Sequence, residues 1–117
     1  MNPAQPPAGT ALCRLDEIAD PGAKGFDFRE VEALFMGFVV RQGERAMGYV
    51  DRCPHAGWPL ASDTDRYLTR DGGYIICSGH GAAFRLDTGL CMFGPCRGWS
   101  LSAWPVEVGA DGVVRTA

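Results

Sequence analysis

Two short segments of the chain place a cysteine close to a histidine. Cys53 and His55 lie in the sequence CPHAG, and Cys77 and His80 lie in the sequence CSGHG. The chain contains 2 histidines, and each lies within three residues of one of these cysteines. Both segments contain glycine and follow a stretch of β-type sequence. Two thiolates and two imidazoles on two such loops make a four-ligand metal site.

Few metal centres use this ligand set. One is tetrahedral zinc, and another is a two-iron cluster in which one iron binds both cysteines and the other binds both histidines. Zinc loops usually keep like ligands together, whereas here each loop mixes a cysteine with a histidine. Unrelated core or loop residues would have to fall into two matching pairs by chance. The sequence therefore favours the two-iron cluster, with structural zinc as the rival.

Length and composition restrict the class of protein. A chain of 117 residues with 46% hydrophobic and 21% charged residues is typical of one globular domain. A net charge of −3 and a pI near 5.2 do not suggest a nucleic-acid-binding protein. No apolar run is long enough to span a membrane, and the first ten residues lack the features of a secretory signal. We expect a cytoplasmic protein whose partners include neither nucleic acid nor membrane.

The elements that position the two loops are expected to be short β-strands. Turn sequences such as RQGE, DGG, DTG and GADG separate apolar or alternating segments, a pattern typical of an all-β sandwich or barrel. One helical turn is expected at 16–20, before Pro21. Residues 1–9, with three prolines, read as a flexible leader. The expected strands are 11–15, 25–28, 33–40, 45–50, 73–76, 82–86, 105–108 and 113–115.

The two loops resemble the ligand boxes of the Rieske [2Fe–2S] proteins, which have the form C-x-H and C-x₂-H. Residues 80–101 also resemble the strand, turn and proline loop that this family places over its cluster. The resemblance implies a Rieske-like antiparallel β-sandwich as a single domain over 10–117, with a small cluster-binding subdomain at about 51–98. It implies one [2Fe–2S] cluster per chain. By the family's pattern, Cys53 and Cys77 bind one iron, and His55 and His80 bind the other, more exposed iron.

The chain departs from the high-potential members of that family at four positions. Trp58 and Gly79 stand where those members have a second cysteine in each box, so the disulfide that joins the boxes is absent. Ala82 and Phe84 stand where those members have a serine and a tyrosine that donate hydrogen bonds to the cluster sulfurs. Such donors stabilise the reduced cluster, so their loss lowers the potential. We predict a midpoint in the lower half of the Rieske range, about −150 to 0 mV.

The remaining cysteines, tryptophans and arginines receive simpler interpretations. A site formed by Cys53 and Cys77 with Cys91 and Cys96 would leave both histidines unexplained, so Cys13, Cys91 and Cys96 are expected to be buried free thiols. The tryptophans are expected to pack in the interior, with Trp58 shielding the cluster. Arg52 and Arg97 are either solvated side chains or cations that favour reduction of the cluster. The residues concerned are Cys13, Arg52, Trp58, Cys91, Cys96, Arg97, Trp99 and Trp104.

The function that the sequence favours is one-electron transfer. Both histidines are committed to the cluster, so none remains for a mononuclear iron, and no G-x-G-x-x-G segment is present to bind a flavin or nicotinamide. The resemblance implies a soluble ferredoxin, not itself an enzyme, that passes electrons from a ferredoxin reductase to a terminal oxygenase. The alternatives are a small subunit of an assimilatory, nitrite-type reductase and a zinc-bound or metal-free interaction module.

The manner of docking follows from the charge distribution. Residues 51–100 contain as many acids as arginines, and the acidic excess lies upstream, at 16–32. We therefore expect a monomer that meets its redox partners transiently, through the edges of His55 and His80 and the apolar surface around them. Its electron transfer should depend only modestly on salt.

Overall fold

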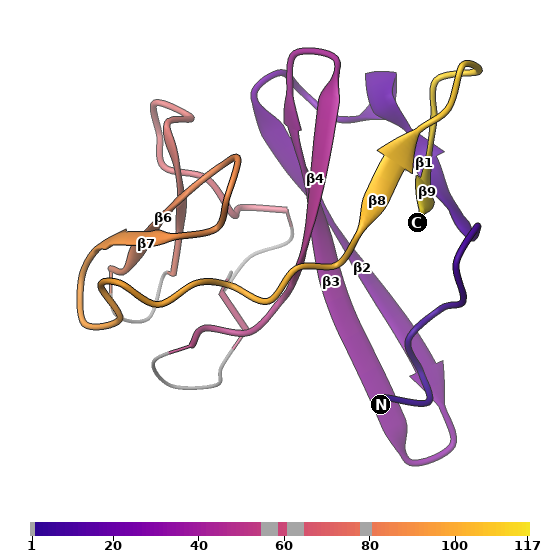
Figure 1. Cartoon of the computed structure of the whole chain (residues 1–117), viewed down its shortest axis with the longest axis horizontal. Helices are drawn as coiled ribbons and strands as arrows, with labels where there is room; N and C mark the ends of the chain where they lie inside the picture. Colours follow the sequence, from indigo (N-terminus) through magenta and orange to yellow (C-terminus); the bar gives the residue numbers. More distant parts are fainter. Residues whose placement is uncertain (1, 55–58, 61–64, 78–80) are drawn as a thin grey trace.

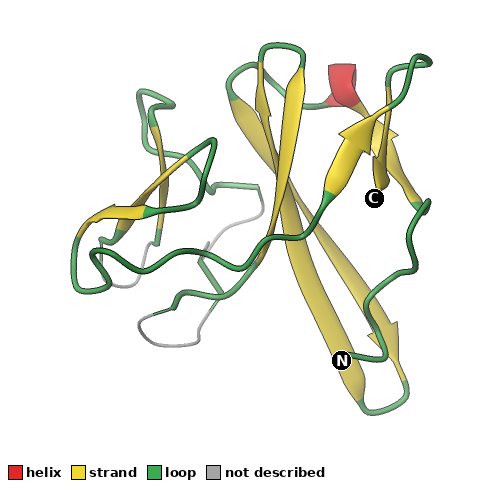
Figure 2. Cartoon of the chain, viewed as in Figure 1, coloured by secondary structure: helices red, strands yellow, loops and turns green. Residues whose placement is uncertain are grey.

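The chain is built from three small antiparallel sheets. The computed structural model describes residues 2–54, 59–60, 65–77 and 81–117. Figure 2 shows strands joined by loops, with one short 3₁₀ turn, η1 (Leu15–Glu17). The strands are β1 (Ala11–Arg14), β2 (Gly22–Glu30), β3 (Ala33–Gln42), β4 (Arg45–Val50), β5 (Tyr74–Ile76), β6 (Ala83–Arg85), β7 (Cys91–Phe93), β8 (Val106–Val108) and β9 (Val113–Thr116).

Two of the sheets form a base. One has the order β2–β3–β4, in which β2 pairs with β3 from Gly22↔Arg41 to Glu30↔Ala33. The other has the order β1–β9–β8, so it pairs the first strand of the chain with the last. Trp104 is 1% exposed and packs with its ring edge-on against Phe35, at a centroid distance of 5.1 Å. Phe26 and Phe28 contact the same indole, so this aromatic cluster holds the base together.

The third sheet, β5–β6–β7, lies on the opposite side of the long β2–β3–β4 sheet from β8 and β9 (Figure 1). It has a separate buried core, which includes Phe38 from β3 and Ile75 from β5. The chain enters this part after β4 and returns before β8. The two crossings run side by side, since Val50 N donates to Ser102 O at 2.9 Å and Tyr49 forms an antiparallel bridge with Ala103.

The predicted all-β architecture is confirmed, with differences at the level of single elements. β7 was not expected, because three residues between two turns carry little strand signal. β2 extends from residue 22 to residue 30 rather than 25–28, since its pairing with β3 continues through charged positions. The expected helical turn begins one residue earlier and is a 3₁₀ turn of three residues.

The first residues lie against the base. Ala4 is buried, Asn2 Nδ2 donates to Leu34 O at 2.9 Å, and Gly9 N donates to Thr116 O at 2.7 Å. The flexibility of the leader and the boundaries of the subdomain remain predictions. Among the described residues, no helix is long and apolar enough to cross a membrane.

Candidate functional site

The first predicted loop begins where β4 ends. Asp51 N donates to Met36 O at 2.9 Å, so the chain is still tied to β3 just before Cys53. The Cys53 side chain is completely buried, in the same core as Phe38 and Ile75. The sequence therefore turns inward at Cys53 directly after a strand that is fixed to the base.

The buried carboxylate of Asp51, just before this loop, accepts hydrogen bonds from two residues that follow it. Asp51 is 7% exposed, and its two oxygens accept hydrogen bonds from Leu60 N and from the Tyr67 hydroxyl, each at 2.8 Å. The Tyr67 ring stacks on Phe38, with 4.3 Å between ring centroids and 6° between the planes. Burial, followed by the charge and hydrogen bond of Asp51, raises the pKa of Tyr67 well above its usual value, so Tyr67 remains a donor. This network was not predicted, because a lone aspartate at a strand end usually signals a solvated turn.

The second predicted loop begins after β5. Cys77 is 1% exposed, and its backbone N–H donates to Ala82 O at 2.8 Å. Gly81 N donates back to Cys77 O at 2.9 Å, so the described ends of this loop are held together. Because β5 pairs with β6 from Tyr74↔Arg85 to Ile76↔Ala83, the hairpin fixes the position of Cys77.

The predicted proline loop, 94–96, packs against Ala82, the residue that directly follows the second predicted loop. Gly94 has φ +100°, and a Cβ placed on it would lie 2.7 Å from Ala82 Cα. The backbone at Gly94 therefore approaches Ala82 more closely than any residue with a side chain allows. Three backbone hydrogen bonds close this loop on itself, Cys91 N to Trp99 O at 2.7 Å, Gly98 N to Cys91 O at 3.1 Å and Trp99 N to Cys96 O at 2.9 Å.

Four cysteines lie in one buried core. Cys53, Cys77, Cys91 and Cys96 are each at most 2% exposed and belong to the same cluster of buried residues. Although all four are described, no group of three or more histidine, cysteine, aspartate or glutamate side chains in the described part of the chain is placed to hold a metal ion. The described residues thus show no four-cysteine arrangement of the kind weighed from the sequence. Cys91 and Cys96 instead contact each other, with their sulfurs 3.1 Å apart, as the buried free thiols expected of them.

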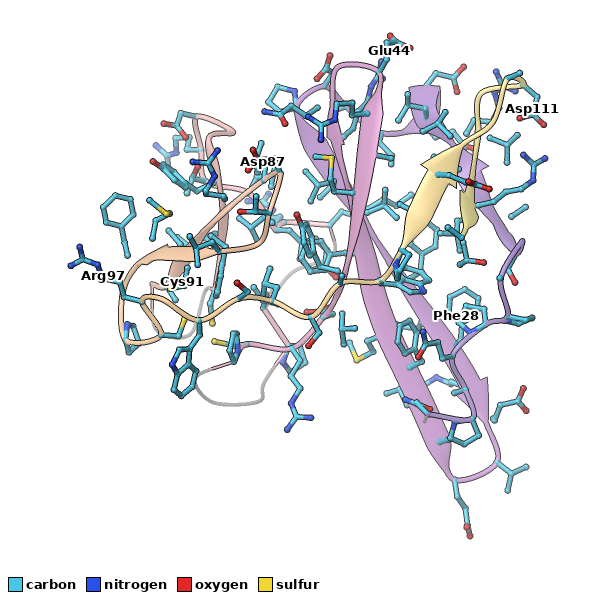
Figure 3. All side chains as sticks on the ribbon, viewed as in Figure 1. Phe28, Glu44, Asp87, Cys91, Arg97 and Asp111 are labelled. Carbon is cyan, nitrogen blue, oxygen red and sulfur yellow. The ribbon has the colours of Figure 1, made fainter. Side chains whose placement is uncertain are left out.

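The other sequence predictions divide into three groups. His55, Trp58, Gly79 and His80 lie outside the described residues. Cys13 is only partly buried, because it lies in the edge strand β1, and the expectation of a buried thiol was wrong for it. Arg52 and Arg97 are exposed, and Figure 3 places Arg97 at the outer edge of the β5–β7 part. Their effect on a cluster remains a prediction.

Two aromatic side chains, one before and one after the proline loop, face solvent. Phe93 is 55% exposed and Trp99 is 59% exposed. The expectation that the tryptophans pack in the interior was right for Trp104 and wrong for Trp99, because the hydrogen bonds that close the loop involve only the backbone of Trp99. No periodic pattern in the sequence distinguishes these two exposed aromatics from core residues.

Ala82 and Phe84 have side chains that donate no hydrogen bonds, as the sequence requires. Both are completely buried next to the second predicted loop, and Phe84 pairs with Ile75 across the β5–β6 hairpin. Both positions are therefore occupied by buried apolar side chains that pack in the core.

Comparison with solved structures identifies the same fold in structures that contain ferredoxins. The ferredoxin of carbazole 1,9a-dioxygenase from Nocardioides aromaticivorans IC177 is 23% identical, with a TM-score of 0.69 over 92% of this chain and 97% of that one. The Sphingomonas yanoikuyae B1 ferredoxin is 22% identical, with a TM-score of 0.66 over 92% and 96%. A chain from the complex of reduced oxygenase and oxidized ferredoxin in carbazole 1,9a-dioxygenase is 26% identical, with a TM-score of 0.66 over 91% and 90%.

Comparison with sequences gives the family. No curated protein sequence matches the chain significantly. The profile of the Rieske [2Fe–2S] domain matches residues 10–105, which include both predicted boxes and the proline loop. The chain therefore belongs to the Rieske [2Fe–2S] domain family, whose cofactor is a [2Fe–2S] cluster.

Proposed function

We propose that this chain is a ferredoxin that carries one electron at a time from a reductase to the oxygenase component of a multicomponent dioxygenase, and that it catalyses no reaction alone. The observation that carries the proposal is the extent of the structural match. The likeness covers nearly the whole of this chain and nearly the whole of a chain from the carbazole dioxygenase complex.

We further propose Cys53, His55, Cys77 and His80 as the cluster ligands. The described half of this set fits a two-iron cluster, because both cysteines are buried at the starts of loops and belong to one core. Thiolates are poorly solvated in such a core unless a metal ion compensates their charge. When bound, the cluster supplies reversible transfer of one electron.

The chain's own residues then have distinct tasks. The Asp51 carboxylate and the Tyr67 hydroxyl hold the described residues around the Cys53 loop, and the close contact of Gly94 with Ala82 keeps the proline loop on the Cys77 loop. Ala82 and Phe84 contribute no side-chain hydrogen-bond donor to this core, which favours the lower potential predicted from the sequence.

Phe93 and Trp99 are proposed as the apolar part of the docking surface. Both are exposed aromatic residues close in sequence to Cys96, which shares a core with Cys53 and Cys77. Exposed aromatic side chains commonly anchor protein–protein contacts. The contact is expected to be small and transient, as in other redox encounters.

A cytoplasmic location and a monomeric state are part of the proposal. All five cysteines are free in the structure, as expected for a reducing compartment.

The function is tested by metal analysis and electron transfer. Protein purified anaerobically should contain two irons and two sulfides per chain, give a Rieske-type EPR signal after dithionite reduction, and have a midpoint of about −150 to 0 mV. It should then reduce the oxygenase component of carbazole 1,9a-dioxygenase, used as the acceptor. Stoichiometric zinc without iron, or a midpoint above about +150 mV, would overturn the proposal.

The ligand assignment is tested separately. Cys53→Ser and Cys77→Ser should lose the cluster, whereas Cys13→Ser, which changes a cysteine in β1, should keep the full iron content. His80→Cys and His55→Cys should lose the cluster or lower its potential sharply, because a thiolate adds negative charge. A histidine variant with unchanged spectrum and potential would show that this histidine is not a ligand.

A further inference from the structure

The Cys91 and Cys96 thiols form a pair that the proposed function does not use. The Cys96 thiol donates to the Cys91 sulfur at 3.1 Å, and the Cys91 thiol donates to Phe93 O at 3.2 Å. Both side chains are buried, at 2% and 1% exposure. The pair lies in the buried core that also contains Cys53 and Cys77.

The backbone around the pair is already held in a closed loop. Gly98 and Trp99 return to Cys91 and Cys96 through three backbone hydrogen bonds of the proline loop. A disulfide has its sulfurs about 2.05 Å apart, so the two sulfurs need to approach by about 1 Å. Rotation of the two side chains supplies movement of this size while the loop stays closed.

We propose that Cys91 and Cys96 are a reversible modification site, at which a small-molecule disulfide oxidises the two thiols to an intramolecular disulfide across the proline loop. One thiolate attacks the small disulfide and releases one small thiol. The second thiolate then attacks the mixed disulfide and releases the other small thiol. The S–S bond of the reagent breaks and one forms between Cys91 and Cys96, while two electrons and two protons pass to the reagent.

Burial determines how readily the reaction occurs. Burial and the hydrogen bond with Cys91 raise the pKa of Cys96, which keeps this thiol protonated at neutral pH. Exchange therefore requires transient opening of the loop and is slow. Once formed, the disulfide replaces both thiol hydrogen bonds with a covalent link and fixes the loop that covers Ala82.

The site differs from the box-to-box disulfide of the high-potential proteins. The positions of that disulfide are Trp58 and Gly79 in this chain, whereas the proposed bond lies within one loop. It would restrain the proline loop against the second box without joining the two boxes. The proposal concerns the thiols alone, so it does not depend on which oxygenase receives the electrons.

The test uses the cluster-loaded protein in anaerobic glutathione buffers of increasing oxidised fraction. After acid quenching, free thiols are alkylated under denaturing conditions and the protein is digested with trypsin. Cleavage after Arg85 and Arg97 gives a peptide, 86–97, that contains Cys91 and Cys96 and no other cysteine. The expected product is this peptide without alkyl groups and two hydrogens lighter than the dithiol form, and dithiothreitol should restore two alkylation sites.

Two variants and one control keep the result interpretable. Cys96→Ser should never give the linked peptide, and its Cys91 should be recovered either alkylated or, in oxidising buffers, as an unresolved glutathione adduct. Cys13→Ser should behave as the unaltered chain. The unaltered chain oxidised in urea shows that the linked peptide is detectable, and the visible spectrum shows whether the cluster remains. The proposal is overturned if the folded chain, after prolonged incubation in excess oxidised glutathione, still has two alkylated cysteines or carries separate glutathione adducts on them.

Discussion

At the scale of single residues, Asp51 contributes more to the site than its position in the sequence suggests. Its carboxylate is buried and accepts two hydrogen bonds, from Leu60 N and the Tyr67 hydroxyl. Hydrogen bonds to a buried charged group are stronger than those on the surface, and loss of the acceptor is costly. Asp51 thereby links β4, the end of the first loop and the segment before β5.

Removing this carboxylate should destabilise the protein. Asp51→Ala is expected to lower the free energy of unfolding by about 3 kcal/mol, and Tyr67→Phe by about 1 kcal/mol. Urea unfolding measures both. Asp71→Ala is the matched control, because Asp71 also accepts two hydrogen bonds, from Thr69 Oγ1 and Gly73 N, on an exposed turn. Equal losses for Asp51→Ala and Asp71→Ala would contradict the role assigned to burial.

Tyr49 gives a prediction for alkaline pH. Its hydroxyl donates to Leu86 O at 2.8 Å, and burial, with a smaller effect of the Asp87 charge, raises the pKa of Tyr49 to about 12. An unfolded tyrosine titrates near pH 10. Between about pH 10 and 12 the unfolded chain loses this proton while the folded chain keeps it, so stability falls as pH rises.

The Tyr49→Phe variant isolates this contribution. It should be less stable than the unaltered chain at pH 8, because a hydrogen bond is lost, but its urea midpoint should fall less steeply from pH 10 to 12. Tyr67 has the same sign of shift, so part of the slope remains. An unchanged slope in Tyr49→Phe would show that the Tyr49 hydroxyl does not carry the raised pKa.

At the scale of elements, the sequence predicts the strands and loops better than the contacts between them. The paired Cys-His motifs, the turn sequences and the short apolar segments lead to an all-β fold and to the candidate ligands. β7 was missed because Cys91–Phe93 is identified as a strand only by its pairing with β6. The tertiary partners of Asp51 are equally invisible, since Tyr67 is 16 residues away.

The packing of the proline loop on the second loop can be tested at Gly94. Gly94→Ala should destabilise the protein by about 2 kcal/mol or more, because a Cβ at φ +100° is strained and would lie 2.7 Å from Ala82 Cα. Gly98→Ala is the matched control, with φ +89° but no atom within 4 Å of its added Cβ. Thermal unfolding should show the larger loss at Gly94, and equal losses would mean that backbone strain alone matters there.

At the scale of the whole molecule, the exposed aromatic surface lies far from the β2–β3 turn. Phe93 belongs to β7, in the β5–β6–β7 sheet. Val31 lies in the turn between β2 and β3, which Figure 1 shows well away from β7. Both are exposed apolar residues. This pair therefore allows a general effect of surface hydrophobicity to be separated from docking.

Electron transfer to the oxygenase component should depend on the surface at Phe93 and Trp99. Phe93→Ser and Trp99→Ser are expected to lower the second-order rate by about tenfold each at unchanged midpoint potential, whereas Val31→Ser leaves it unchanged. Raising the salt concentration from about 20 to 300 mM should change the rate by less than about threefold. A steep loss with salt, or an equal effect of Val31→Ser, would contradict apolar docking.

The two crossings between the base and the site have a consequence for how such proteins diversify. The segment from Asp51 to Ala103 leaves and re-enters the base at neighbouring points, held by the Val50–Ser102 hydrogen bond and the Tyr49–Ala103 bridge. Its two ends therefore lie next to each other, as the ends of an inserted domain do in the protein that carries it, here called the host. Recombination at these points can exchange the redox part between hosts, so that its tuning and the surface of the base evolve separately.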